Sequence, residues 1–127
     1  MRGVEAEIPP GSIGNLDTVF NSLARAASNV YDKGYDIGFL HVKGPYIAGH
    51  DKNYIGKVRI IESIDAIMAE ILNEINLEKT VVGLVSDHST PCYVRDHSRD
   101  PYRLRFSPLI SGEIPWIAMM KSAVLGK

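Results

Sequence analysis

The chain is poor in several features that mark whole classes of protein. Its 127 residues contain one cysteine, Cys92, which excludes an intrachain disulfide framework, fits a reducing cytoplasm, and is expected to be a buried thiol rather than a nucleophile. No apolar run approaches the length of a membrane span, and the N-terminus has no signal-like hydrophobic region. The formal net charge of −1 gives no electrostatic reason to expect nucleic acid or anionic membrane as a partner. With 45% hydrophobic and 23% charged residues, the composition predicts one soluble cytoplasmic domain.

The most informative segment is an apolar run that leads into a polar turn. Residues 80–85 predict a buried parallel strand, with Asp87 and His88 directly after it and His97 nine residues after His88. In open α/β sheets, ligands gather at the carboxyl ends of such strands. A carboxylate beside an imidazole can bind a divalent cation there. The other interpretation, which stays open, is an Asx-turn followed by an ordinary surface histidine.

A second predicted strand also ends near a histidine. Residues 36–43 have strand character, and the following segment 44–53, interpreted as a loop, carries His50. Three of the four histidines therefore fall just past predicted strands. The fourth, His41, lies inside the first run and is expected to be a packed or hydrogen-bonded core histidine.

Helical patterns flank and connect these strands. Residues 56–78 carry apolar side chains at spacings of three and four, which predicts one helix between the two strands. A strand, a helix and a strand in this order form a right-handed parallel unit, which brings His50 to the same sheet edge as the Asp87-His88 pair. Residues 16–33 predict another amphipathic helix, with Asn15 or Asp17 as its N-cap and Gly34 at its end.

The last third of the chain has weaker patterns. Residues 102–106 and 108–110 are interpreted as short strands. The tail from Ile114 to Leu125 is apolar without clear periodicity and is interpreted as a short helix.

Taken together, five segments resemble the archaeal-type cofactor-independent phosphoglycerate mutases of the alkaline phosphatase superfamily. The resemblance extends over about residues 14–110, and the Asp-His-Ser-Thr-Pro run with a nearby His-Ser-x-Asp-Pro segment is its most specific part. The segments are Gly14–Thr18, Phe39–Pro45 with Ala48–Asp51, Lys57–Asp65, Ser86–Cys92 and Asp96–Pro101.

The resemblance implies a fold and a division of the chain. The fold is α/β: a partial alkaline phosphatase-like three-layer arrangement, with a mostly parallel sheet and flanking helices. Residues 1–13 are expected to be an irregular lead-in, and residues 14–110 the C-terminal part of the phosphatase-like metal-binding domain. Residues 111–127 are expected to be a divergent apolar tail.

The resemblance also implies a chemistry. Members of this family interconvert 3-phosphoglycerate and 2-phosphoglycerate in glycolysis by metal-dependent phosphoryl transfer through a phosphoserine. Two divalent ions, manganese, cobalt, zinc or magnesium, activate the serine and neutralise charge on the phosphoryl group. By position, Asp87 and His88 are the expected ligands of one ion, and His50 and His97 are those of the other.

The sequence departs from the family in ways that bear on activity. Tyr46 stands where the family has an aspartate ligand, four residues before His50, and a neutral phenol is a poor replacement for a carboxylate. The family's N-terminal half, with its serine nucleophile, has no counterpart in residues 1–13. We therefore assign no catalytic residue and expect an incomplete metal site and a chain that is inactive alone.

These departures lead to two expectations about partners and function. The chain is expected to form a homo-oligomer or to be complemented by an N-terminal polypeptide, because half of a large sheet exposes an apolar edge and face. Phosphoglycerate would bind if the site were completed. The apolar tail, with Trp116, is expected to cover part of the exposed sheet. The alternative function is a non-catalytic oligomeric or metal-binding domain derived from the same family.

Overall fold

The chain contains both helices and strands, as expected for an α/β protein. The computed structural model describes residues 6–85, 89–99, 105–106 and 116–121. The elements, in chain order, are α1 (Phe20–Asp32), β1 (Ile37–His41), α2 (Gly44–His50), α3 (Tyr54–Glu74), β2 (Thr80–Val85), β3 (Arg105–Phe106) and β4 (Trp116–Lys121).

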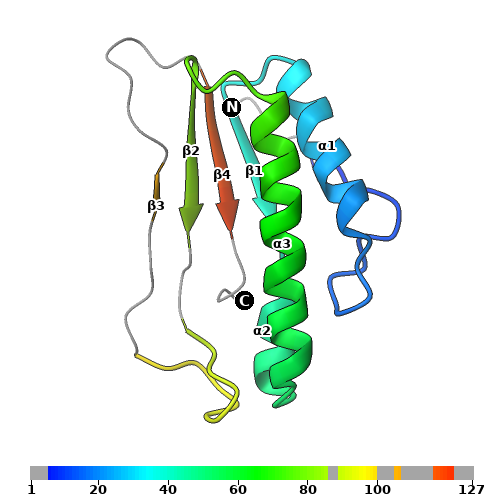
Figure 1. Ribbon diagram of the computed structural model, residues 1–127, viewed down its shortest axis with the longest axis vertical. Coiled ribbons are helices and arrows are strands. Elements are labelled where there is room, and N and C mark those ends of the chain that lie inside the picture. The colour runs from blue at the N-terminus through cyan, green and yellow to red at the C-terminus, as the bar shows by residue number, and fades with distance from the viewer. Residues whose placement is uncertain (1–5, 86–88, 100–104, 107–115, 122–127) are drawn as a thin grey trace.

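The four strands form one sheet in the order β1-β4-β2-β3. β4 runs parallel to both of its neighbours, with Ile117 opposite Ile37 of β1 and opposite Val81 of β2. β3 is antiparallel to β2, with Phe106 opposite Gly83. The expected parallel orientation of the two strands that flank the long helix is confirmed, but β4 lies between them (Figure 1).

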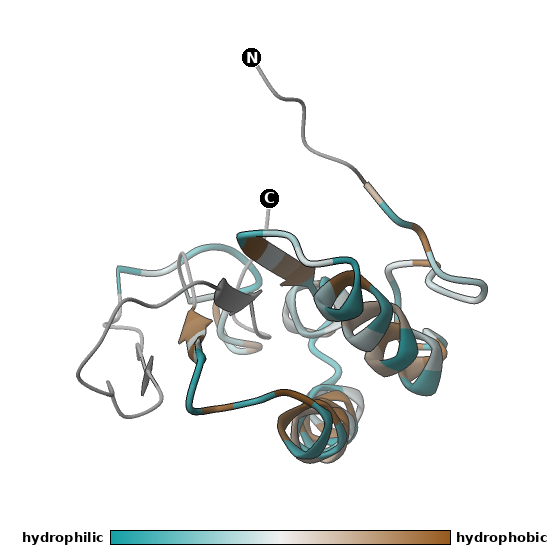
Figure 2. Ribbon diagram, turned by 90° about the horizontal axis from the view of Figure 1, so that it is seen from above, coloured by the Kyte–Doolittle hydropathy of each residue, from teal (hydrophilic) through white to brown (hydrophobic). Residues whose placement is uncertain are grey.

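Helices α1 and α3 both lie on one face of this sheet (Figures 1 and 2). The core lies between them and the sheet, and its largest share comes from α3. Its buried residues include Leu23 and Ala24 of α1, Ala48 of α2, Ile60, Ile64, Ile67 and Ile71 of α3, and Val82 of β2. The described residues therefore form two layers, with the helices on one face of the sheet.

The long helix α3 follows the predicted amphipathic pattern. Its buried isoleucines recur at spacings of three and four residues, which places them on the face that packs against the sheet. The helix begins two residues earlier than predicted because the Asn53 side chain caps it, accepting a hydrogen bond from the Gly56 backbone N–H at 2.8 Å. Within the described residues, no helix has the length and apolarity needed to cross a membrane.

The first helix, α1, ends where the sequence predicts and begins later. Gly34 adopts a φ of +73°, and its N–H donates to the carbonyl of Tyr31 at 3.0 Å, a helix stop that glycine makes without steric cost. The predicted capping residues are wrong. Val19 occupies the N-cap position without a side-chain cap, and the Asn15 side chain instead accepts from the Asp17 N–H.

The segment 44–53, interpreted as a loop, contains the helix α2 instead. Pro45 lies in its first turn, where the missing N–H of proline costs nothing, and Gly49 is buried near its end. Pro45 therefore lies at a helix start, and Gly49 lies where α2 packs closely against Thr90. The helix matters for the candidate site because His50 is its last residue.

The apolar tail is also different from its prediction, because residues 116–121 form the strand β4 rather than a short helix. A strand paired along both sides in a parallel sheet reads as a continuous apolar run without alternation, which explains the absent period. Residues of the tail do take part in the sheet, as a strand between β1 and β2. The boundary expected at residue 111 stays a prediction.

Two smaller predictions have different outcomes. His41 is exposed rather than part of the core, because it shares the exposed side of β1 with Ile37 and Phe39, while Leu40 and Val42 face the helices. Of the predicted strand 102–106, the structure describes β3, and the predicted strand 108–110 lies outside the described residues.

Candidate metal centre

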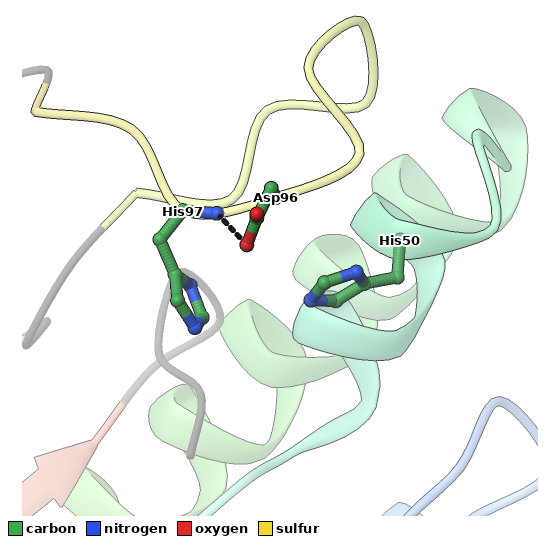
Figure 3. Close-up of side chains that lie close together, drawn as sticks. All are labelled: His50, Asp96 and His97. Carbon is green, nitrogen blue, oxygen red and sulfur yellow. Dashed lines mark hydrogen bonds between the residues drawn. The ribbon is translucent and has the colours of Figure 1, made fainter.

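Two segments that are far apart in the sequence meet below the carboxyl ends of β1 and β2. His50 is the last residue of α2, and Asp96 and His97 lie in the segment that follows β2. Figure 3 shows His50 reaching from the helix toward the chain that carries Asp96 and His97. One potential ligand atom from each of these three residues lies within 4.8 Å of the others.

The two histidines have different surroundings. The rings of His50 and His97 are nearly perpendicular, at 83°, with their centroids 5.9 Å apart. His50 is half-buried, and its Nε2 is a buried polar atom that has no hydrogen-bond partner among the described residues. Such atoms are rare in folded proteins, and a neutral imidazole nitrogen in this situation is suited to binding a metal ion.

Tyr46 forms one wall of the site. It lies four residues before His50 on α2, and residues at this spacing share one face of a helix. Its ring contacts that of His50 edge-on at 4.6 Å between centroids and stacks on His97 at 5.7 Å. The side chain at position 46 is therefore directed at the same site as His50.

The segment that carries His97 is fixed to α2 and α3 through Thr90. Thr90 is fully buried, its carbonyl accepts a hydrogen bond from the Lys57 Nζ at 2.7 Å, and its Oγ1 lies 3.5 Å from Nδ1 of His97. The buried Cys92 Sγ lies 3.7 Å from the carbonyl oxygen of Ala48. These contacts orient the His97 ring relative to α2, which is the role of outer-shell partners in metal sites.

Lys57 is a partly buried lysine whose pKa is displaced. Burial disfavours its ammonium form and lowers the pKa below the ordinary value of a lysine, while the neighbouring Cys92 thiol acts in the opposite direction. The folded state therefore binds this proton more weakly than the unfolded state does.

This pKa predicts how stability depends on pH. Because the unfolded state holds more protons, the contribution of Lys57 to the free energy of unfolding should rise with pH between its folded pKa and about 10.4, the unperturbed value. We expect urea unfolding at a series of alkaline pH values to show this rise in the native protein and not in Lys57→Met. Parallel profiles for the two proteins would contradict the assignment.

The sequence predicted part of this site and missed one residue. His50 and His97 are brought together, as expected from their positions after two strands. Asp87 and His88 lie outside the described residues, so their roles stay predictions. Asp96 was missed, although a signal was present: it is a carboxylate beside an imidazole, the same pattern that drew attention to Asp87-His88.

The side chains present fit a divalent cation. Two imidazoles and one carboxylate are a common ligand set for zinc and other first-row metals. The unpartnered Nε2 of His50 supplies an observation of this structure that points the same way.

Comparison with known proteins matches the chain to a family of metalloenzymes. Residues 1–104 match the family described as the Metalloenzyme superfamily. The chain belongs to the Metalloenzyme superfamily. This membership supports a divalent metal as a cofactor of the fold.

Within the superfamily, the chain is similar to archaeal enzymes named 2,3-bisphosphoglycerate-independent phosphoglycerate mutase. It is 41% identical to that of Pyrococcus abyssi over 103 residues, which is 80% of this chain and 25% of the relative. It is 35% identical to that of Ignicoccus hospitalis over 99 residues, or 78% of this chain and 23% of the relative. The family resemblance is thus confirmed, and the chain spans about a quarter of the length of these curated relatives.

A solved structure shows the same architecture. The PH0037 protein from Pyrococcus horikoshii aligns with a TM-score of 0.80 and 29% identity over 93% of this chain and 39% of its own. The Pyrococcus horikoshii protein therefore has the same arrangement of helices and strands as this chain.

Proposed function

We propose that this chain is the metal-binding portion of a phosphoglycerate mutase and does not turn over substrate by itself. The observation that carries the proposal is that His50 and His97, 47 positions apart in the sequence, meet where the buried Nε2 of His50 has no hydrogen-bond partner among the described residues. A divalent ion held there would withdraw charge from a phosphoryl group during its transfer between the two hydroxyl positions of phosphoglycerate. The pair Asp87 and His88 follows β2 directly and would hold a second ion.

The proposal includes the finer fold and a partner. The described sheet and helices would be one part of an alkaline phosphatase-like three-layer fold in the cytoplasm, with the serine nucleophile supplied by another polypeptide. In the described sheet β1 is an edge strand, and its Ile37 and Phe39 side chains are 60% and 57% exposed. Apolar side chains on a sheet edge favour association, either with that polypeptide or with a second copy of this chain.

A non-catalytic metal-binding or oligomeric domain is the second candidate. Tyr46 favours it, because the ring occupies the helix position from which the family's aspartate would reach the ion. Both candidates predict metal binding. They differ in whether the bound metal serves a phosphoryl transfer.

Turnover measurements test the first candidate and separate it from the second. The purified chain with manganese and 3-phosphoglycerate, prepared free of host mutase, should form no 2-phosphoglycerate, because none of its residues is assigned as a covalent carrier of the phosphoryl group. Turnover by the chain alone would overturn this proposal. The remaining three-quarters of the Pyrococcus abyssi mutase, added as a separate polypeptide, should form a complex by light scattering and restore turnover. A complex that binds metal but stays inactive would favour the second candidate.

A further inference from the structure

We propose that Asp96 supplies the carboxylate ligand of this centre, so that His50, Asp96 and His97 together bind one divalent transition-metal ion without a ligand from position 46. The inference deepens the proposed metal-binding function and rests on it. It assigns a ligand that the family resemblance does not imply, and it predicts that substitutions at positions 46 and 96 depend on each other.

The first argument is the charge that the site needs. In the family the carboxylate comes from position 46, and here that position carries a phenol, which is neutral at pH 7. The Tyr46 ring packs against both histidine rings, so it fills the space beside them with an aromatic wall. Two imidazoles alone would leave the positive charge of the ion without a counter-charge. Among the described residues, the cluster around His50 and His97 contains one carboxylate, that of Asp96.

The second argument is the distance between the potential ligand atoms. The three potential ligand atoms lie within 4.8 Å of one another, whereas ligands around a tetrahedral zinc ion at about 2.0–2.1 Å are roughly 3.3 Å apart. The centre therefore has to contract by at most about 1.5 Å. Asp96 is exposed, so a small shift of its side chain toward the two histidines meets little packed structure. Figure 3 shows Asp96 between His97 and the His50 ring, which is the direction that the contraction requires.

The third argument is that the Asp96 carboxylate is already oriented. Its Oδ1 accepts a hydrogen bond of 2.7 Å from the backbone N–H of His97. This bond occupies one oxygen and leaves Oδ2 as the atom that would bind the ion. The residue before it, Arg95, has a φ of +63°, a left-handed conformation that turns the chain just before Asp96 and His97. A carboxylate held in this way loses less side-chain entropy when it binds a metal.

The resulting ligand set has a chemical consequence. Two histidines and one carboxylate occupy three positions of a four- or five-coordinate ion and leave at least one position open. That position suits a water molecule or an anionic oxygen, such as that of a phosphoryl group. The set favours zinc, cobalt or manganese over calcium, since imidazole is a poor ligand for calcium.

Zinc affinity of the full chain tests the proposal, measured by competition with a chromophoric chelator. Asp96→Asn keeps the size and one oxygen of the side chain and removes the charge, so the zinc affinity should fall by a factor of about 10–100. Asp65→Asn is the matched control, because Asp65 is an exposed aspartate of α3 outside the cluster, and it should leave the affinity unchanged. Cobalt added in place of zinc gives a second readout, since the visible absorption of the bound ion should change in Asp96→Asn and not in Asp65→Asn.

The double variant Tyr46→Asp/Asp96→Asn gives the decisive comparison. If the two positions supply the same ligand by different routes, Tyr46→Asp should recover most of the affinity that Asp96→Asn loses. The inference is overturned if Asp96→Asn binds zinc as tightly as the native chain while His50→Ala binds it weakly, an outcome that leaves the proposed metal-binding function intact. Failure of the native chain to bind zinc, cobalt or manganese would overturn both.

Discussion

A chain that ends at residue 115 is expected to remain unfolded under conditions in which a chain that ends at Lys121 is folded. The shorter chain lacks β4, which pairs with β1 from Ile117 to Lys121 and with β2 along its whole length. Each ladder hydrogen bond contributes about 1 kcal/mol net, and the two ladders together approach the 5–15 kcal/mol that stabilises a whole small domain. Without β4, the strands β1 and β2 would also face each other across a gap of one strand.

Circular dichroism and urea unfolding measure this difference. The longer variant is the matched control, because it removes only residues 122–127 and keeps every described strand pairing. We expect a cooperative transition for the longer chain and none for the shorter one. A cooperative transition of similar midpoint in both would mean that β4 is not an integral strand of the sheet.

Gly49→Ala is expected to lower both the stability of the fold and the metal affinity of the centre. A Cβ atom at this position would lie 2.4 Å from the carbonyl oxygen of Thr90 and 3.1 Å from its Cγ2. Thr90 has no room to retreat, because it is fully buried and its carbonyl is hydrogen-bonded to Lys57. Overpacking of this kind costs about 1–3 kcal/mol or more, and replacing a helical glycine by alanine returns roughly 0.5–1 kcal/mol.

The effect on metal binding follows from the position of the clash. Gly49 precedes His50, and Thr90 orients His97, so relief of the clash has to move the two histidines apart. We expect the free energy of unfolding to fall by about 2 kcal/mol and the zinc affinity by about tenfold.

Gly34→Ala serves as the control for this variant. It should destabilise the chain by about 1 kcal/mol, because alanine disfavours the positive φ there, but it should leave zinc affinity unchanged since an added Cβ at Gly34 meets no neighbour within 4 Å. Equal losses of zinc affinity in both variants would show that the Gly49 effect is general destabilisation.

The parts of the fold that the sequence predicts well are those with a strong local pattern. The isoleucines of α3 recur at the helical period, and β2 is a short continuous apolar run, so both elements are found within a few residues of their predicted positions. The same patterns place His50 and His97 after two predicted strands, and the structure brings their rings together, while their role as ligands stays a prediction.

The missed features depend on contacts between distant segments. Position 49 of α2 requires a glycine because Thr90, 41 positions later, packs against it. The sequence around position 49 does not indicate that contact. The sequence of β4 shows no alternation of apolar and polar residues because the strand pairs on both sides. This pairing cannot be inferred from the sequence of one segment. Asp96 becomes a candidate ligand only when α2 brings His50 beside it.

The place of β4 in the sheet also sets the order in which the protein can fold. The strand that separates β1 from β2 is the last of the described strands to leave the ribosome, and Ile37 has to wait for Ile117, 80 positions later, before it gains its ladder partner. Closing a loop of that length is slow compared with docking α1 on α3. During synthesis, β1 and β2 therefore expose unpaired backbone edges, and a chain stalled before residue 116 is the species most prone to aggregate or to be captured by a chaperone.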